Sequence, residues 1–341
     1  MKRQSLYFLE PQRVEVREES LAAPGLGQVL VQTLLSAVSS GTELLIYRGQ
    51  APAEMPVDES IVALPGKFTF PLKYGYAAVG RVKALGPKVV QYWQDKLVFA
   101  FQPHESFFLA APEELWLVPG DLTPEDAVFL ANMETAITLA LDGQPLLGEQ
   151  VAIFGQGVVG LLLTALLSRL PLASLVTLDL YPRRRLASES LGADTSLDPQ
   201  APEAMKQLLT WLKGSRHHSG ADLIYELSGN PAALDQAIAA TGYHGRVVVG
   251  SWYGLKKVDL HLGVEFHRQR LKLISSQVSR LAPELSGRFN KSRVLELAWQ
   301  MLRKIKPSRL ITQRFPLTQA PQAYQLIDQN PGETLQVVLT Y

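Results

Sequence analysis

The stretch Val151-Ala152-Ile153-Phe154-Gly155-Gln156-Gly157-Val158-Val159-Gly160 decides the fold of this chain. Its first four residues form an apolar run typical of a buried strand, and the next six fit the pattern G-x-G-x-x-G. The pattern is informative here because it follows a predicted strand and opens a predicted helix at 158–170. The glycines permit a tight turn, close approach of a pyrophosphate, and close helix–strand packing. Free N–H groups of the turn and helix start, including those of Gln156, Val158 and Val159, then predict a phosphate-binding site.

Asp179 ends the next predicted strand, at 175–178. A carboxylate at this distance from the glycine turn is suited to accept hydrogen bonds from the adenosine ribose. Arg183, Arg184 and Arg185 follow, and they either hold a 2′-phosphate or form a solvated helix face. Because Asp179 would repel a 2′-phosphate, the sequence favours NAD over NADP. Ser228 follows a further strand and is expected to line the nicotinamide ribose.

Strand and helix signals alternate after Gln150, which predicts an α/β domain with a parallel sheet and helices on both faces. Residues 1–125 are β-rich, with Gly and Pro between short apolar runs, and Thr123-Pro124-Glu125-Asp126 is a typical helix start. A helix is expected at 292–305 and a terminal strand at 336–340. We therefore expect a dinucleotide-binding domain at 126–279, inserted into a β-rich domain made of 1–125 and 280–341.

Composition excludes several classes of protein. The 341 residues include 33 Lys and Arg against 32 Asp and Glu, so charge gives no case for nucleic acid or an anionic membrane. Cysteine is absent, which rules out disulfides and thiolate-bound zinc. No uninterrupted apolar run reaches about 18 residues, so no membrane span is expected. We expect a cytoplasmic protein. His217 and His218 are expected in a loop without a metal.

Several motifs resemble those of the medium-chain dehydrogenase/reductase superfamily, whose members combine a GroES-like catalytic domain with an inserted Rossmann domain. Ser40-Gly41-Thr42-Glu43 resembles Cys-Gly-Thr-Asp, and Gly75-Tyr76-Ala77 resembles Gly-His-Glu. Asp95-Lys96-Leu97-Val98 resembles Gly-Asp-Arg-Val. Asn132-Met133-Glu134-Thr135-Ala136 and Phe266-His267-Arg268 are similar to a subgroup related to bacteriochlorophyllide a dehydrogenase. The resemblance implies hydride transfer with NAD or NADP.

The resemblance also marks departures from the zinc-dependent members. Ser40 and Tyr76 stand where those enzymes carry Cys and His ligands, and a neutral hydroxyl or phenol is a poor zinc ligand. We therefore expect no catalytic zinc. A possible set of ligands for a hard metal is Glu43, His104 and Glu134, although the sequence does not show that they converge.

Without zinc, hydroxyls or an imidazole must manage the substrate oxygen and its proton. Thr42 matches the superfamily's relay hydroxyl or serves as a turn hydroxyl. Tyr76 either donates to a substrate oxygen or fills space, and Ser40 is a weaker donor candidate. His104 is a proton acceptor or a loop residue. Glu134 is a buried functional acid or a salt-bridged one.

The leading hypothesis is an NAD(P)-dependent oxidoreductase that interconverts a small-molecule secondary alcohol and its ketone. The alternatives are a zinc-free enone or quinone reductase and a dinucleotide-binding sensor without turnover. By resemblance we also expect a homodimer, formed through the apolar edge strand 271–276 of the Rossmann sheet.

Overall fold

The computed structural model describes residues 1–58, 60–212 and 220–341, so His217 and His218 lie outside the described residues. The chain divides into two compact units, 1–131 with 302–341 (unit 1) and 132–301 (unit 2). Helices α3 (Leu130–Gly143) and α8 (Lys291–Ile305) contain the two boundaries. The expected boundaries at 125/126 and 279/280 follow changes in the strand and helix pattern, and each lies before the helix that contains the corresponding boundary.

In its described part, unit 1 holds a two-stranded antiparallel sheet and a seven-stranded mixed sheet with the order β14-β15-β3-β4-β5-β7, β6 pairing β3. Its strands are β1 (Lys2–Glu10), β2 (Arg13–Ser20), β3 (Val29–Ala37), β4 (Ala78–Leu85), β5 (Leu97–Ala100), β6 (Phe107–Ala110), β7 (Leu115–Leu117), β14 (Ile311–Pro316) and β15 (Gln336–Thr340). Its helices are α1 (Thr42–Tyr47), α2 (Pro124–Ala127) and α9 (Ala320–Gln329), with single turns at Gln91–Trp93, Pro112–Glu114, Pro307–Leu310, Leu317–Gln319 and Pro331–Glu333.

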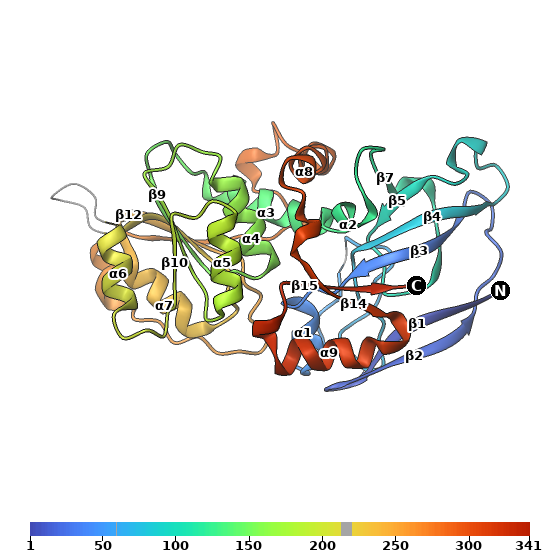
Figure 1. Ribbon diagram of the computed structural model, residues 1–341, viewed down its shortest axis with the longest axis horizontal. Helices are drawn as coiled ribbons and strands as arrows, with labels where there is room; N and C mark the ends of the chain where they lie inside the picture. The colour runs from blue at the N-terminus through green and yellow to red at the C-terminus, as the bar shows by residue number, and fades with distance from the viewer. Residues whose placement is uncertain (59, 213–219) are drawn as a thin grey trace. The chain divides into compact units, whose positions relative to one another are not determined.

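Strand β15 joins distant parts of the sequence in unit 1. It pairs in parallel with β14 and antiparallel with β3, so the last strand of the chain lies beside one formed near its start (Figure 1). Alternate apolar residues of β3, β4, β5 and β6 form one core on a face of this sheet, as expected for antiparallel strands. That core contains Val29, Val31, Val82, Val98, Ala100, Phe108, Ala110 and Leu115.

Unit 2 is built on a parallel sheet with the order β10-β9-β8-β11-β12-β13. Its strands are β8 (Gln150–Phe154), β9 (Ser174–Leu178), β10 (Thr195–Leu197), β11 (Ala221–Glu226), β12 (Thr241–Val249) and β13 (Lys272–Ser275). The helices between them are α4 (Val158–Leu167), α5 (Pro182–Ser190), α6 (Ala204–Trp211) and α7 (Pro231–Ala240), with helical turns at Leu262–Phe266 and Pro283–Leu285.

The order of these strands reverses beside β8. Strands β9 and β10 extend the sheet to one side of β8, whereas β11, β12 and β13 extend it to the other. Right-handed crossovers therefore place α4 and α5 on one face and α7 on the opposite face. In Figure 1, α4 lies close to α5, and α6 lies close to α7. A reversal of this kind leaves a crevice at the carboxyl ends of the strands, where open α/β sheets bind ligands.

The sequence predicted most of unit 2. Strands β8 and β9 and the strand before Ser228, β11, are confirmed, as are the helix start capped by Thr123 and strand β15 in unit 1. The prediction that the helix from Val158 continues to residue 170 is wrong, because α4 ends at Leu167. Pro171 disfavours helical conformation in the residue before it. The β1–β2 hairpin, α6 and α9 were not predicted.

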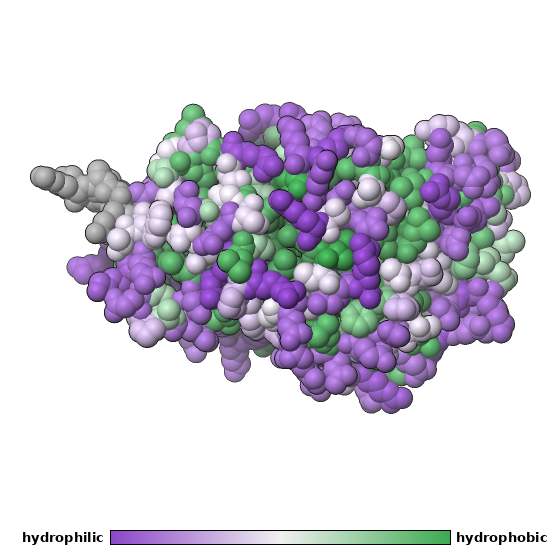
Figure 2. All heavy atoms as spheres, viewed as in Figure 1, coloured by the Kyte–Doolittle hydropathy of each residue, from purple (hydrophilic) through white to green (hydrophobic). Residues whose placement is uncertain are grey.

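Strand β13 is the edge of the described parallel sheet, and Leu273 on it is 40 % exposed. No helix within the described part of the chain is long and apolar enough to cross a membrane. Hydrophilic residues are widespread over the visible face of both units (Figure 2).

The β1–β2 hairpin carries a charged cluster that predicts pH-dependent stability. Burial raises the pKa of Glu19, but hydrogen bonds from Tyr7 and Ser5 and the charges of Lys73 and Arg3 outweigh it and lower that pKa to about 2. Because this lies below the ordinary value of 4.5, the stabilisation is complete above about pH 4.5 and is lost as the pH falls toward 2.

Glu19→Gln should therefore lower the free energy of unfolding by about 1–2 kcal/mol at pH 7, and by progressively less below pH 4.5. Urea unfolding across this range measures the difference. Glu18→Gln is the matched control, because Glu18 lies on the same strand and forms an exposed ion pair with Lys2. Equal losses in the two variants at pH 7 would contradict the prediction.

Candidate functional site

The glycine turn of unit 2 is held by close backbone contacts. Gly155 has φ +92°, and a Cβ there would lie 2.6 Å from the backbone of Leu227 and Ser228. A Cβ on Gly160 would lie 2.1 Å from the Gly155 carbonyl oxygen. Both positions therefore require glycine to keep β8, α4 and the end of β11 together. Gly157 differs, because a Cβ there would meet no heavy atom within 4 Å.

Gly157 is the residue that precedes α4, and the first N–H groups of this helix point out of its N-terminus. The open space over Gly157 lies at this end of the helix. Partial positive charge and free donors at such a terminus favour an anion, and absence of a Cβ allows it to approach the backbone. Of the two neighbouring valines, Val158 is buried and Val159 is partly exposed, so these residues contribute backbone groups and packing.

Asp179 is tied to this turn. Its Oδ2 accepts a hydrogen bond from the Gln156 N–H at 2.7 Å, and its Oδ1 accepts one from the Tyr181 N–H at 2.9 Å. Each carboxylate oxygen has a second lone pair, so both can still accept a bond from a ribose hydroxyl. Asp179 is 7 % exposed, and the turn is thus fixed to the end of β9 by an anionic acceptor.

The basic residues after Asp179 have different surroundings. The Arg184 guanidinium lies 3.8 Å from Asp179 Oδ2 and 4.9 Å from the centre of the Tyr181 ring. Arg185 donates to the carbonyl oxygens of Asp179 and Leu180 and lies 3.4 Å from Asp198. Arg185 is therefore engaged in holding the loop, while Arg184 lies beside the expected ribose site.

The side chains of two predicted cofactor residues form hydrogen bonds with other residues of the protein. The fully buried Gln156 donates to the Gly155 carbonyl oxygen and accepts from Thr164 Oγ1 at 2.9 Å. The Ser228 hydroxyl donates to buried Glu226 and accepts from the Asn230 N–H. Both residues shape the turn through their side chains, and their backbone groups remain the ones suited to a cofactor.

In unit 1, half-buried hydroxyls gather where α1 begins. This hydroxyl cluster consists of Ser39, Ser40, Thr42 and Tyr76. The Tyr76 phenol donates to Ser39 Oγ at 2.5 Å. Burial raises the pKa of Tyr76, hydrogen bonds with Ser39 and Thr42 oppose the rise, and the charge of Glu43 adds to it. The phenol therefore stays protonated at neutral pH and acts as a hydrogen-bond donor.

A largely buried polar network lies next to this cluster. Glu43 and His104 are both 0 % exposed, and His104 Nε2 lies 3.0 Å from Glu43 Oε2. His104 Nδ1 lies 2.6 Å from Ser36 Oγ, which is 2.7 Å from the Tyr341 hydroxyl. Tyr324 also donates to Glu43 Oε2. The structure thus brings His104 and Glu43 together, but it places His104 out of reach of solvent, unlike the exposed loop residue that the sequence allowed.

Glu134 belongs to unit 2 and is 2 % exposed. Its Oε1 lies 2.6 Å from Lys291 Nζ. Burial raises the pKa of Glu134, and Lys291 opposes this rise. This is the salt-bridged arrangement that the sequence left open for Glu134.

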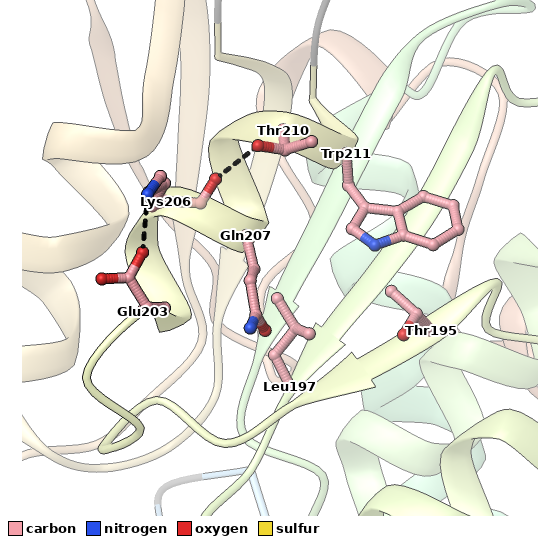
Figure 3. A pocket seen from close by; sticks show the side chains of 7 residues that line it. All are labelled: Thr195, Leu197, Glu203, Lys206, Gln207, Thr210 and Trp211. Carbon is pink, nitrogen blue, oxygen red and sulfur yellow. Dashed lines mark hydrogen bonds and ion pairs between the residues drawn. The ribbon is translucent and has the colours of Figure 1, made fainter.

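Unit 2 also contains a cavity of about 420 Å³ between β10 and α6 (Figure 3). Its lining contains none of the residues that the sequence predicted to bind a cofactor. An ion pair between Lys206 and Glu203 borders it, and the Trp211 indole lies over its other end (Figure 3). The glycine turn and this cavity are therefore separate features of unit 2.

Comparison with known proteins agrees with this geometry. Residues 158–291 match the family model described as zinc-binding dehydrogenase. The chain is 23 % identical to D-guloside 3-dehydrogenase of Escherichia coli K12 over 96 % of each chain. In fold it resembles 2R,3R-butanediol dehydrogenase of Bacillus subtilis, with a TM-score of 0.81, 17 % identity and 99 % of each chain covered.

Sequence and fold are both similar to zinc-type alcohol dehydrogenases. A further structure, an alcohol dehydrogenase of E. coli CFT073 in complex with NADH, has a TM-score of 0.79 and 18 % identity, covering 100 % of this chain and 99 % of the other. The predicted fold class, a GroES-like domain with a Rossmann domain, is confirmed. The chain is an oxidoreductase enzyme.

The residues of this chain do not fit the zinc site of such enzymes. Ser40 offers a neutral hydroxyl, and the Tyr76 phenol is protonated and already donates to Ser39. Zinc prefers thiolate, imidazole or carboxylate. Within the described ranges, no three His, Cys, Asp or Glu side chains gather as a ligand set. Glu43 and His104 already bond to each other, and Glu43 also accepts bonds from Tyr324 and Ser39.

Sequence reasoning missed Ser36, Ser39 and Tyr324. Ser39 precedes a predicted site residue but matches no motif, and Tyr324 lies on a helix that was not predicted. The one available signal was an acid in the motif Ser40-Gly41-Thr42-Glu43, directly before the apolar run of α1.

Gly157→Ala tests the glycine turn without disturbing its fold. Because a Cβ at this position meets nothing and Gly157 has φ −66°, the variant should keep its melting temperature. The methyl group would occupy the space that a pyrophosphate needs, so the dissociation constant for NADH, measured by fluorescence, should rise about 10-fold or more. Gly120→Ala, in unit 1, is the matched control, since its Cβ also meets nothing. Unchanged NADH binding by Gly157→Ala would contradict the assignment.

Proposed function

We propose that this chain is an NAD(P)-dependent oxidoreductase that interconverts a secondary alcohol and a ketone without catalytic zinc. The observation that carries the proposal is the glycine turn at the start of α4, with Asp179 bonded to its backbone at 2.7 Å. D-guloside 3-dehydrogenase and 2R,3R-butanediol dehydrogenase are named for secondary alcohols, which supports the substrate class. The resemblance to bacteriochlorophyllide a dehydrogenase points to the same chemistry.

The nicotinamide, when bound, supplies the hydride acceptor or donor of the reaction. The glycine turn and the N-terminus of α4 bind the pyrophosphate, and Asp179 accepts from the ribose. The hydroxyl cluster holds the substrate oxygen: Thr42 and Ser40 offer hydroxyl donors, and the neutral Tyr76 phenol orders the cluster by donating to Ser39 Oγ. The same donors suit the oxygen of an enone, so a zinc-free enone or quinone reductase is the second candidate.

NAD is the preferred cofactor in this proposal. The Asp179 carboxylate faces the expected ribose site and would repel a 2′-phosphate, whereas Arg184 at 3.8 Å partly balances its charge. Neutralising Asp179 should therefore shift preference toward NADPH. Asp194 provides a matched control, because its Oδ2 likewise accepts from a backbone N–H, that of Leu175, at 2.7 Å.

The test combines cofactor binding, metal content and turnover in one preparation. We expect tighter binding of NADH than of NADPH, sub-stoichiometric zinc by mass spectrometry, and reduction of NAD⁺ with secondary alcohols. Asp179→Asn should raise the NADPH-to-NADH affinity ratio about 10-fold, and Asp194→Asn should leave it unchanged. About one removable zinc per chain that activity requires would contradict the zinc-free reaction. Turnover of enones but not of secondary alcohols would favour the reductase. Cofactor binding without turnover of either secondary alcohols or enones would favour a sensor.

The proposal includes a homodimer formed through β13. An unpaired edge strand with the half-exposed Leu273 offers backbone donors and acceptors to a second copy. Sedimentation at micromolar concentration should give twice the chain mass, and Leu273→Lys should give the monomer mass. Leu147→Lys is the control, since Leu147 is 77 % exposed and lies outside the sheet. A monomeric wild-type protein would exclude the dimer.

A further inference from the structure

Ser39 is the best-anchored member of the hydroxyl cluster. Its backbone N–H donates to Glu43 Oε1 at 2.7 Å, and its carbonyl oxygen accepts from the Glu43 N–H at 2.9 Å. Two bonds to one residue fix both sides of the Ser39 peptide. The Ser39 side chain is therefore aimed by Glu43, which is itself buried.

The Ser39 hydroxyl can still donate one hydrogen bond. Its oxygen accepts the bond from the Tyr76 phenol, which the raised pKa of Tyr76 keeps protonated. In the described part of the chain, the Ser39 proton has no acceptor. A hydroxyl that accepts one hydrogen bond becomes a stronger donor through cooperativity. Ser39 is also partly exposed, so this proton is available to an oxygen atom from outside the protein.

The His104 ring contacts both partners of the Ser39–Tyr76 bond indirectly. On one side its Nε2 bonds to Glu43, which holds Ser39. On the other side it packs against Gly75, the neighbour of Tyr76: a Cβ on Gly75 would lie 2.9 Å from His104 Cδ2 and Nε2. One buried imidazole thus supports the backbone that carries each hydroxyl.

Glu43 depends on His104 in turn. A carboxylate that is 0 % exposed needs charge balance or several donors to remain in place. His104 Nε2 lies at hydrogen-bond distance from Glu43 Oε2, 3.0 Å, and Tyr324 and the Ser39 N–H donate further bonds to the same carboxylate. Ser36 fixes the far side of the imidazole at 2.6 Å.

We propose that Ser39 donates a hydrogen bond to the substrate oxygen, and that Glu43 and His104 form a positioning pair that aims Ser39 and Tyr76. This inference rests on the proposed function and adds to it a donor and the device that orients it. The oxygen recognised is a ketone carbonyl or the corresponding secondary alcohol. A pair of preset hydroxyls then does the orienting that a metal does in zinc-dependent dehydrogenases. Because folding already orients these hydroxyls, little free energy is needed to reorganise the site when a substrate binds.

A double-mutant cycle tests the proposal in the full-length protein with NAD⁺ and the best secondary alcohol of the wild type. Ser39→Ala should lower kcat about 100-fold, with a much smaller change in KM. Glu43→Gln should lower kcat about 10-fold in the wild-type background but less than threefold in the Ser39→Ala background. This loss of the Glu43 effect is expected because a positioning residue acts through the group it positions.

A structural role alone predicts a different result. In that case the fold-changes in kcat from the two substitutions would multiply. Glu43→Gln would lower kcat by the same factor, and the melting temperature by the same amount, in the wild-type and Ser39→Ala backgrounds. Multiplying effects, or full activity of Ser39→Ala, would overturn the proposal. If Glu43→Gln does not fold, His104→Gln replaces it, since it keeps a donor to Glu43 but removes the ring that packs on Gly75.

The control is His261→Ala. His261 also pairs with a carboxylate, Asp235, at 2.8 Å, but its side chain is 81 % exposed and lies in unit 2. Its removal should leave kcat, KM and NADH binding unchanged. NADH binding should also be unchanged in every unit 1 variant. Absence of turnover by the wild type defeats the proposed function, whereas turnover by the wild type with full activity in Ser39→Ala defeats this inference alone.

Discussion

Close approach of bare backbone at Gly155 is the constraint on which unit 2 depends. Three segments meet there: the end of β8, the start of α4, and the residues after β11, with a Cβ on Gly155 only 2.6 Å from Ser228. Any side chain at this point would push the helix away from the sheet. Because the segments do meet, the N–H groups of the turn converge near Asp179, whose carboxylate bonds to the Gln156 N–H. Fold and anion site therefore arise from the same contact.

In unit 1 the candidate site is ordered by a buried hydrogen-bond network. Its candidate chemistry lies in hydroxyls, which are neutral and weakly directional on their own. Direction comes from the buried Glu43 and His104, whose bonds extend to Ser36, Ser39 and Tyr324. Burial makes each of these bonds costly to break, since the freed polar group would have no water to bond. The network thus stiffens a part of the surface that has no metal ligand set within its described residues.

Prediction from sequence succeeded where local pattern and long-range contact coincide. Strand β8 with its glycine turn is a contiguous signal, so the sequence predicted the Rossmann domain correctly and named candidate cofactor residues by number. The network around His104 has no such signal, because its members lie at positions 36, 43, 104, 324 and 341 and meet only after folding. The sequence left His104 as either a proton acceptor or a surface loop residue, and the ring is fully buried. Ser39 was overlooked because its importance comes from its backbone bonds to Glu43, which no motif encodes.

The place of β15 in its sheet has a consequence for synthesis on the ribosome. This strand lies between β14 and β3, and Tyr324 of α9 completes the bonding of Glu43. A nascent chain therefore exposes the edge of β3 and leaves Glu43 short of a donor until α9 and β15 have emerged. Unit 2 is contiguous and complete by residue 301, so it can fold while unit 1 is still open. Chaperones that bind unpaired strands would thus have their target at β3 until β15 has emerged and paired with it.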